Sequence, residues 1–170
     1  MSRQKEKRWF SSAWISNRLV HSARTGIGTA ASLAVARLLG MPEAYWAPIT
    51  TLIVMQSTIG ASWGASKPRF MGTALGAASG VLLASYVEPG LIVFSAAIFA
   101  LGLICEILCL DQNASRFAGI TLTIVLLVGR GEPPWLIGVH RFVEVSLGIT
   151  VALALTALWP ERELASGENS

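Results

Sequence analysis

Apolar residues in this chain occur in long runs, separated by short segments that contain charged, polar or turn-forming residues. A helix of about 20 apolar residues is long enough to cross a hydrocarbon layer of about 30 Å. The runs that approach this length lie at about residues 21–40, 44–63, 68–87, 90–109, 114–130 and 135–159. The pattern predicts an all-α, polytopic membrane protein with six transmembrane helices in residues 19–160, between a segment 1–18 and a tail 161–170.

The second and third runs meet at a short basic segment. Residues 44–66 contain no acidic or basic side chain, and Lys67, Pro68 and Arg69 then precede the third run. A tight basic corner between two spans is the plain interpretation, and it places Arg69 in the first turn of the third helix. The unpaired N–H groups of a helix N-terminus favour an anion, so a cation in that position needs an offsetting partner.

Glycines recur at helical spacing in the third run. A spacing of four residues aligns them on one helix face, and such stripes of small residues let membrane helices approach each other closely. We therefore expect helix contacts at these glycines and at similar positions elsewhere. The expected contact positions are Gly72, Gly76 and Gly80, with Gly148 in the sixth run and Gly60 and Gly64 as further candidates.

Composition agrees with a membrane domain and argues against a soluble one. Hydrophobic residues make up 53% of the 170 residues and charged residues only 14%, against about 25% charged in an ordinary soluble domain. The mean hydropathy is +0.58. The net charge of +3 does not indicate nucleic-acid binding, because the basic residues gather at the N-terminus and at the ends of the apolar runs. Positive charges in those places orient membrane segments.

The distribution of Lys and Arg predicts the orientation in a bacterial inner membrane. With the N-terminus inside, only Arg37, Arg130 and Arg141 of the 13 basic residues fall on the outer side. Positive charge is concentrated in cytoplasmic loops. Residues 1–18 combine basic and aromatic side chains, so they are expected to lie on the anionic inner surface of the lipid bilayer. Both termini are expected in the cytoplasm.

An internal repeat relates the two halves of the chain. A shift of 72 residues superimposes the pattern Trp-x5-Arg-Phe-x4-Leu-Gly around Arg69 on the same pattern around Arg141. Because each half contains three spans, the halves run in opposite directions across the bilayer, as in many transporters. We expect two inverted three-helix halves, with Arg69 at the inner mouth and Arg141 at the outer mouth.

Charged residues inside a span cost about 3 kcal/mol or more unless they are paired or hydrated. Arg141 and Glu144 lie three residues apart on the sixth predicted helix. They form either a structural ion pair or a functional pair, in which Arg141 attracts a carboxylate and Glu144 takes up or releases a proton. The spacing leaves both interpretations open.

Further polar residues inside the predicted spans are candidates for function. Glu106 is the deepest acid of the fourth span, and it either pairs with Arg116 or Arg24 or couples proton movement. Arg24 and Arg69, at the inner ends of their spans, either snorkel to lipid phosphate or bind substrate. Gln56 either bonds to a neighbouring helix or lines a pathway.

The sequence contains no motif for enzymatic chemistry. No nucleophile–base pattern, phosphate-binding loop or metal-ligand spacing occurs. Cys105 and Cys109 share one face of an apolar helix and are expected to pack there, and His21 and His140 have no partner cluster. We expect neither an enzyme nor a bound metal or cofactor.

Short motifs in the second and third runs add a more specific hypothesis. They are Tyr45-Trp46-Ala47, Gln56 and the Arg-Phe-x-Gly-Thr-x-x-Gly stretch of residues 69–76. These motifs resemble the fusaric acid resistance and aromatic acid exporter family of bacterial membrane proteins. The resemblance implies a six-helix membrane module that exports aromatic carboxylates. Larger members of that family carry two such modules and a soluble domain, so a single module is expected to work as a homodimer.

The resemblance and the positions of the charges together imply roles for single residues and leave two alternatives. The residues concerned are Arg69, Arg141, Gln56 and Arg24 in binding a small organic anion, and Glu106 and Glu144 in proton coupling. One alternative is a passive anion channel, as in the plant malate channels that are similar in this module, whose flux does not depend on protons. The other is a non-transporting scaffold or accessory subunit, which binds a fixed partner and shows no flux alone.

Overall fold

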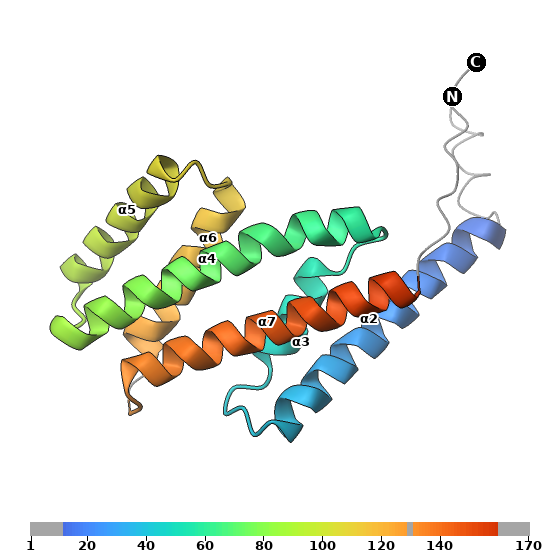
Figure 1. Cartoon of the computed structure of the whole chain (residues 1–170), viewed down its shortest axis with the longest axis horizontal. Helices are drawn as coiled ribbons and strands as arrows, with labels where there is room; N and C mark the ends of the chain where they lie inside the picture. The colour runs from blue at the N-terminus through green and yellow to red at the C-terminus, as the bar shows by residue number, and fades with distance from the viewer. Residues whose placement is uncertain (1–11, 129–130, 160–170) are drawn as a thin grey trace, which may run out of the picture.

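The computed structural model describes residues 12–128 and 131–159 and is helical, without strands, over those residues (Figure 1). The elements in chain order are α2 (Ser12–Leu38), α3 (Trp46–Val54), α4 (Ile59–Tyr86), α5 (Leu91–Ile107), α6 (Gln112–Thr123), the π-helical turn η1 (Ile124–Val128) and α7 (Pro134–Leu158). The all-α prediction is therefore confirmed. The tail 161–170 and most of the segment 1–18 lie outside the described residues.

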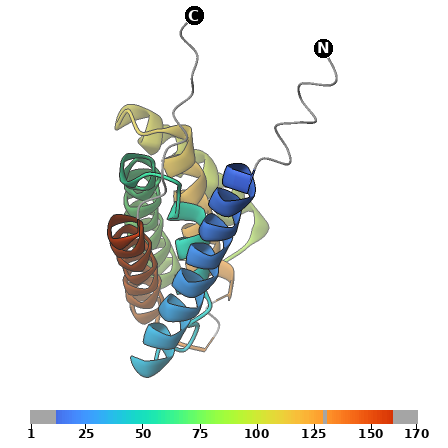
Figure 2. The same ribbon diagram turned by 90° about the vertical axis from the view of Figure 1, so that its right-hand side faces the viewer.

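Two long antiparallel helices, α4 and α7, run through the centre of the molecule. They cross beside Phe70 and Phe142, whose ring centroids are 5.0 Å apart, and the hydroxyls of Ser62 and Thr156 approach to 3.4 Å near one end. α6 packs along α4, whereas α3 packs along α7. Figure 2 shows α3 between α7 and α2, and in Figure 1 α5 lies on the outside next to α6.

The second predicted span is interrupted, and the predicted basic corner is wrong. α3 ends after nine residues, and α4 begins after a short connection. The hydroxyl of Thr58 caps α4 by accepting a hydrogen bond from the backbone N–H of Ala61 (3.2 Å). Because this cap starts the helix early, residues 67–69 lie inside α4, with Pro68 in the helix interior. Arg69 is therefore well inside a 28-residue helix and not in its first turn.

The glycine stripe of α4 lies against α6 at very close range. A Cβ atom at Gly76 would overlap the backbone carbonyl oxygen of Ala118, and Gly72 makes the same kind of approach to Ala114. Gly80 faces Val125 of η1 and Leu122 near the end of α6. Only glycine lets the two helix backbones come so close, which explains why α4 and α6 form an extensive contact.

Gly148 of α7 makes the matching approach to α3. A Cβ atom there would overlap the carbonyl oxygen of Ala47 and lie 2.7 Å from the Cβ of Thr50. Gly60 and Gly64 have no neighbour within 4 Å of such an atom, so the expectation that they are helix contacts is wrong. The sequence spacing is the same, but these two glycines lie on the outward face of α4, whereas Ser62 and Ser66 in the same stretch are buried.

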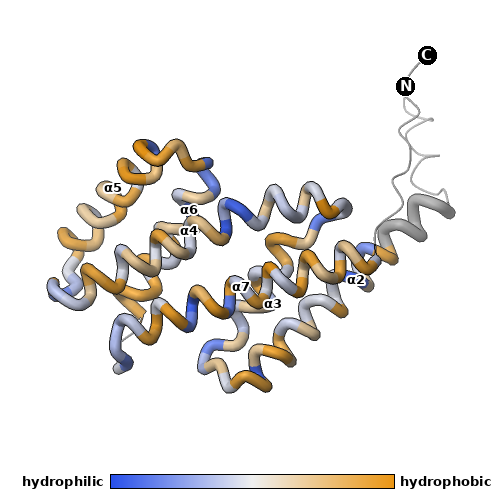
Figure 3. Tube along the Cα trace, in the orientation of Figure 1, coloured by the Kyte–Doolittle hydropathy of each residue, from blue (hydrophilic) through white to orange (hydrophobic). Residues whose placement is uncertain are grey.

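The outer surface of the bundle is strongly apolar. Among the described helices, α7 alone combines the length and apolarity of a membrane span, while α5 and the α6–η1 unit are apolar but shorter. Apolarity alone therefore identifies one span, fewer than the six predicted from the sequence. Figure 3 shows apolar residues along most of α5. The exposed large apolar side chains of α5 are Leu91, Ile92, Phe99, Leu103, Ile104 and Ile107.

Candidate functional site

Arg69 is a buried cation without a carboxylate. Its side chain extends from α4 and is 3% exposed. Its Nη2 donates a hydrogen bond to the hydroxyl of Thr50 on α3 (3.2 Å), and its guanidinium carbon lies 4.5 Å from the ring centroid of Phe117 on α6. Among the described residues no carboxylate is within ion-pair distance, and Nε has no hydrogen-bond acceptor. We refer to Arg69, Thr50 and Phe117 as the Arg69 half-site.

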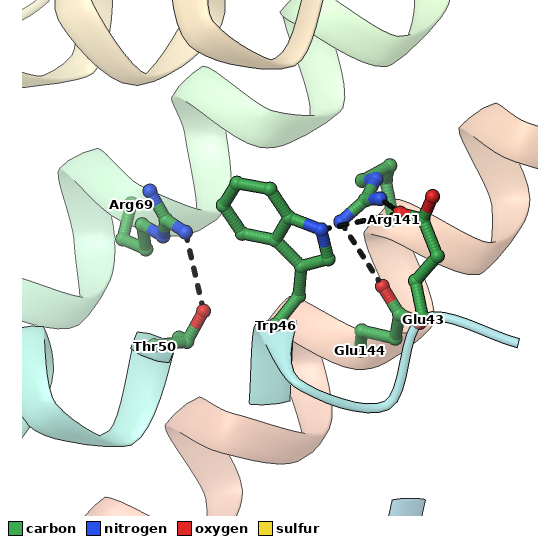
Figure 4. A network of polar contacts seen from close by, with 6 residues as sticks. All are labelled: Glu43, Trp46, Thr50, Arg69, Arg141 and Glu144. Carbon is green, nitrogen blue, oxygen red and sulfur yellow. Dashed lines mark hydrogen bonds and ion pairs between the residues drawn. The ribbon is translucent and has the colours of Figure 1, made fainter. Parts of the chain in front are cut away.

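Arg141 is an equally buried cation with two carboxylates. It lies on α7 and forms ion pairs with Glu43, in the turn before α3, and with Glu144, at 3.4 Å. Its guanidinium carbon is 4.4 Å from the ring centroid of Trp46, and the indole Nε1 donates to Glu43 Oε2 (3.2 Å). Glu144 is only 1% exposed. These four residues form the Arg141 half-site (Figure 4), which contains the ion pair allowed by the sequence spacing and adds Glu43 to it.

The two arginines occupy equivalent places in the internal repeat. Arg69 and Arg141 are 72 residues apart, and the rings beside them, Phe117 and Trp46, are 71 residues apart. The glycine contacts obey the same relation, because α4 meets α6 as α7 meets α3. The repeated sequence therefore makes repeated contacts, with a shift that is one residue shorter for the α3–α6 pair than the sequence alignment predicted.

Both half-sites meet on one helix. Trp46 and Thr50 lie one turn apart on α3, about 6 Å along its axis. Figure 4 shows the Trp46 ring between the guanidinium groups of Arg69 and Arg141. The interior of the molecule thus holds two positive charges close together, of which one is neutralised by the chain itself and the other is not. This pair is the candidate functional site.

A cavity of about 220 Å³ adjoins the Arg141 half-site. Its polar lining comes from Glu43, Glu132, His140 and Arg141, and its remaining walls are apolar. The side chain of Glu43 is 35% exposed, in contrast to the enclosed side chain of Glu144. The Arg141 half-site is therefore reached from the surface through this cavity, while Arg69 is enclosed.

Arg24 is a buried structural clamp, so of the two interpretations left open for it, snorkelling to lipid phosphate is wrong. Its side chain is fully buried. Nη2 donates to the backbone carbonyl of Gln56 (2.6 Å), and Nη1 donates to that of Trp159 (2.9 Å). These bonds join α2 to the connection between α3 and α4 and to the end of α7. Arg69 is equally buried and does not snorkel either.

Gln56 shapes the interruption between α3 and α4. Its backbone N–H donates to the hydroxyl of Ser62 (2.9 Å), and its side-chain Nε2 donates to the carbonyl of Ile53 in the preceding turn (3.4 Å). Its backbone carbonyl accepts the bond from Arg24. The structure does not bring the Gln56 side chain into contact with Arg69 or Arg141.

Glu106 is exposed near the C-terminal end of α5, so the expectation of a deep acid paired with Arg116 or Arg24 is wrong. Within residues 12–128 and 131–159 it has no ion pair. α5 packs through buried residues that include Cys105. Adjacent residues on a helix point about 100° apart, and Glu106 therefore turns away from the bundle. Depth along an apolar run did not reveal which helix face was buried.

Sequence analysis did not identify Glu43 or Phe117 as site residues. Phe117 is the repeat counterpart of Trp46, but an ungapped shift of 72 residues pairs Trp46 with its neighbour instead. A one-residue gap in the alignment would have revealed it. Glu43 precedes α3 in a turn, and only the packing of α3 against α7 brings it to Arg141.

Comparisons with known proteins cover the region that holds both half-sites. Residues 30–155 match the fusaric acid resistance protein-like family. Inner membrane protein YeeA of Escherichia coli (strain K12) is 30% identical over 153 residues, which cover 85% of this chain and 42% of the relative. The chain thus spans less than half the length of that relative. No solved structure matches the chain.

Proposed function

The chain belongs to the fusaric acid resistance protein-like family, and from this we propose that it is a bacterial inner-membrane protein that transports small organic anions. The relative from Escherichia coli is an inner membrane protein, which supports the location. Resistance to an organic acid, as in the family description, is consistent with efflux. Aromatic carboxylates are the substrates that we propose.

The proposed architecture places six helical units across the bilayer as two inverted halves, α2 to α4 and α5 to α7. The antiparallel course of α4 and α7 and the repeated contacts of the two arginines support this arrangement. In such inverted repeats the substrate site lies between the halves, near the middle of the membrane. The two half-sites meet on α3 in a comparable position. A homodimer is the proposed assembly.

The observation that carries the transport proposal is the uncompensated charge of Arg69. A buried cation without a partner costs about 3 kcal/mol in a membrane helix. Neighbouring hydroxyl and aromatic groups offset only part of this cost, since cation–π contacts contribute about 0.5–2 kcal/mol. A site of this kind gains the most from an anion that arrives from outside the chain. The ring of Phe117 supplies an apolar surface beside the charge, which suits an aromatic carboxylate.

Proton coupling is assigned to Glu144 in this proposal. Its carboxylate is buried, and neither oxygen has a hydrogen-bond partner within the described part of the chain. Protonation of Glu144 would release Arg141 from one of its two ion pairs. Glu106, which is exposed on α5, has no comparable link to a buried charge.

The test is flux of radiolabelled benzoate in liposomes that contain the purified chain, with imposed pH and voltage gradients. Arg69→Gln should reduce flux about 10- to 100-fold, because charge-assisted hydrogen bonds contribute about 1.5–3 kcal/mol. Arg116→Gln removes the same charge from an exposed position on α6 and should leave flux unchanged. Glu144→Gln should abolish the response to the pH gradient.

The outcomes separate the possible activities. Flux that follows the pH gradient supports a proton-coupled carrier. Flux that follows voltage and ignores pH identifies a channel, and the assignment of Glu144 then fails. Absence of flux from folded protein, for benzoate and for dicarboxylates alike, contradicts autonomous transport.

A further inference from the structure

The two half-sites share their backbone contacts but differ in charge. Glu144 lies three residues after Arg141, and the position three residues after Arg69 is Gly72. Glu43 lies three residues before Trp46, and the position three residues before Phe117 is Ala114. Uncharged residues therefore occupy, around Arg69, the positions equivalent to the two carboxylates that neutralise Arg141. The cations are present in both halves of the repeat, and the carboxylates in one half only.

The replacement positions around Arg69 are closed by packing. Gly72 and Ala114 touch each other, because a Cβ atom at Gly72 would overlap the carbonyl oxygen of Ala114. This contact belongs to the close packing of α4 against α6. A carboxylate-bearing side chain therefore has no room at Gly72, and the chain offers no other acid to Arg69 within the described residues.

The Arg141 half-site shows how a carboxylate sits between these groups. Glu43 lies in the turn before α3 and not on α4 or α7. Its carboxylate therefore contacts Arg141 from outside the two central helices, from a position that a separate ligand could also take. One oxygen accepts from the Trp46 indole N–H (3.2 Å) and also pairs with the Arg141 guanidinium. The carboxylate thus bridges a guanidinium and the donor of the neighbouring residue on α3.

The Arg69 half-site has the donors for the same arrangement. Arg69 Nε has no acceptor. The hydroxyl of Thr50 accepts from Arg69 Nη2, and its own proton finds no acceptor among the described residues. A guanidinium N–H and a hydroxyl are therefore available to donate hydrogen bonds to an anion at one buried position, next to the ring of Phe117.

We propose that the Arg69 half-site is the anion-binding site, and that the Arg141 half-site is a copy of it permanently occupied by the carboxylate of Glu43. The ligand is a monocarboxylate with an aromatic or apolar body, bound by the Arg69 guanidinium and the Thr50 hydroxyl. Arg141 is then a positioning residue that fixes α3 against α7. This assignment rests on the proposed transport function, and it names Arg69 as the arginine that binds the transported anion.

The packing around Arg69 indicates the side from which a ligand could reach it. α4 is held to α6 backbone against backbone through its glycines, so this side does not open easily. Towards α3 the contact of α4 is slight, and the hydrogen bond from Arg69 to Thr50 is its main polar link. α3 is also the shortest of the described α-helices and ends at an interruption. The site therefore opens by a movement of α3 relative to α4.

The experiment measures how many benzoate molecules bind per chain, by equilibrium dialysis of the purified protein in detergent with radiolabelled benzoate. Wild type should bind a single benzoate, and Arg69→Gln should weaken this binding about 10- to 100-fold. Arg69→Lys keeps the charge and should retain part of the affinity. Arg116→Gln is the matched control, because it removes an exposed positive charge.

The interpretation that Glu43 occupies the Arg141 half-site predicts a gain of benzoate binding when the carboxylates are removed. The double variant Glu43→Gln/Glu144→Gln leaves Arg141 without carboxylates and should bind a second benzoate. Adding Arg141→Gln to this variant should remove the second site and leave the first. A double variant that still binds one benzoate overturns the interpretation of Glu43 as an internal ligand, provided its circular dichroism and elution volume match those of wild type.

The results also separate this inference from the transport proposal. Arg69-dependent binding without flux supports the site and contradicts transport. Flux with benzoate binding that survives Arg69→Gln supports transport and overturns the site. Failure of wild type to bind benzoate, together with absence of flux, overturns both.

Discussion

Three arginines are buried in the described part of the molecule, and each has a different kind of partner. Arg24 bonds to two backbone carbonyls, Arg69 to a hydroxyl and an aromatic ring, and Arg141 to two carboxylates. The first arrangement joins separate segments of chain, and the third pairs the guanidinium with acids of the same chain. The second leaves Arg69 Nε without an acceptor and, within the described residues, its positive charge without a carboxylate. Burial alone therefore does not single out a binding residue, and the missing carboxylate is the reason for proposing Arg69.

Replacement of Arg24 should affect stability more than transport. Arg24→Gln removes donors from the carbonyls of Gln56 and Trp159, and loss of charge-assisted bonds to buried groups costs about 3 kcal/mol. Arg37→Gln, at an exposed position on the same helix, should change stability by less than about 0.5 kcal/mol. The free energy of unfolding, from denaturant titration in detergent, measures both. Equal effects of the two substitutions would contradict the clamp.

The sequence repeat selects the two arginines of the candidate site but not their surroundings. The repeat selects Arg69 and Arg141 because cations and glycines recur at fixed spacing. It gives no information on Glu43, whose role depends on the packing of a turn against α7. Glu106 was misplaced for a related reason, since hydropathy measures how apolar a run is and not which face of its helix is buried.

The glycine contacts of α4 make a prediction at the scale of a helix pair. Gly76→Ala places a methyl group on the carbonyl oxygen of Ala118, so α4 and α6 must separate. Overpacking of this kind costs about 2–3 kcal/mol. Gly64→Ala, in the same helix but with open space around it, should instead stabilise by up to about 1 kcal/mol through helix propensity. Reversible unfolding in detergent measures both variants, and a neutral Gly76→Ala would contradict the close approach.

Helix boundaries could be predicted only in part. Each described helix coincides with a long apolar run, except that α2 already begins at Ser12, within the segment 1–18. The interruption between α3 and α4 escaped detection, since residues 44–66 are uncharged and hydropathy reads them as continuous. The capping hydroxyl of Thr58 is the local signal that was overlooked. Conversely, Lys67-Pro68-Arg69 looked like a corner, although neighbouring helices support that segment inside α4.

The helix lengths constrain how the whole molecule fits a bilayer. α4 and α7, with 28 and 25 residues, are about 42 and 38 Å long. In the proposed six-span arrangement both exceed a hydrocarbon core of about 30 Å, so they would tilt within it or extend beyond it. α3, with nine residues, is only about 14 Å long and ends inside the protein. The bond from Arg24 to Trp159 places the end of α7 beside the middle of α2.

The proposed crossing of α5 can be tested with the native cysteines. Cys109 is exposed beyond the end of α5, and Cys105 is buried. Glu88, in the connection before α5, is exposed at its other end. With the N-terminus in the cytoplasm, a membrane-impermeant maleimide should label Cys109 in inverted vesicles but not in spheroplasts. Glu88→Cys in a Cys109→Ser background should show the reverse.

The pair of labelling results distinguishes crossing from orientation. Labelling of both positions from the same side would contradict a transmembrane α5, even though its exposed surface is apolar. Labelling from opposite sides in the inverse sense would keep the crossing of α5 and reverse the orientation predicted from the basic residues. In that case the cavity beside Arg141 would open to the cytoplasm.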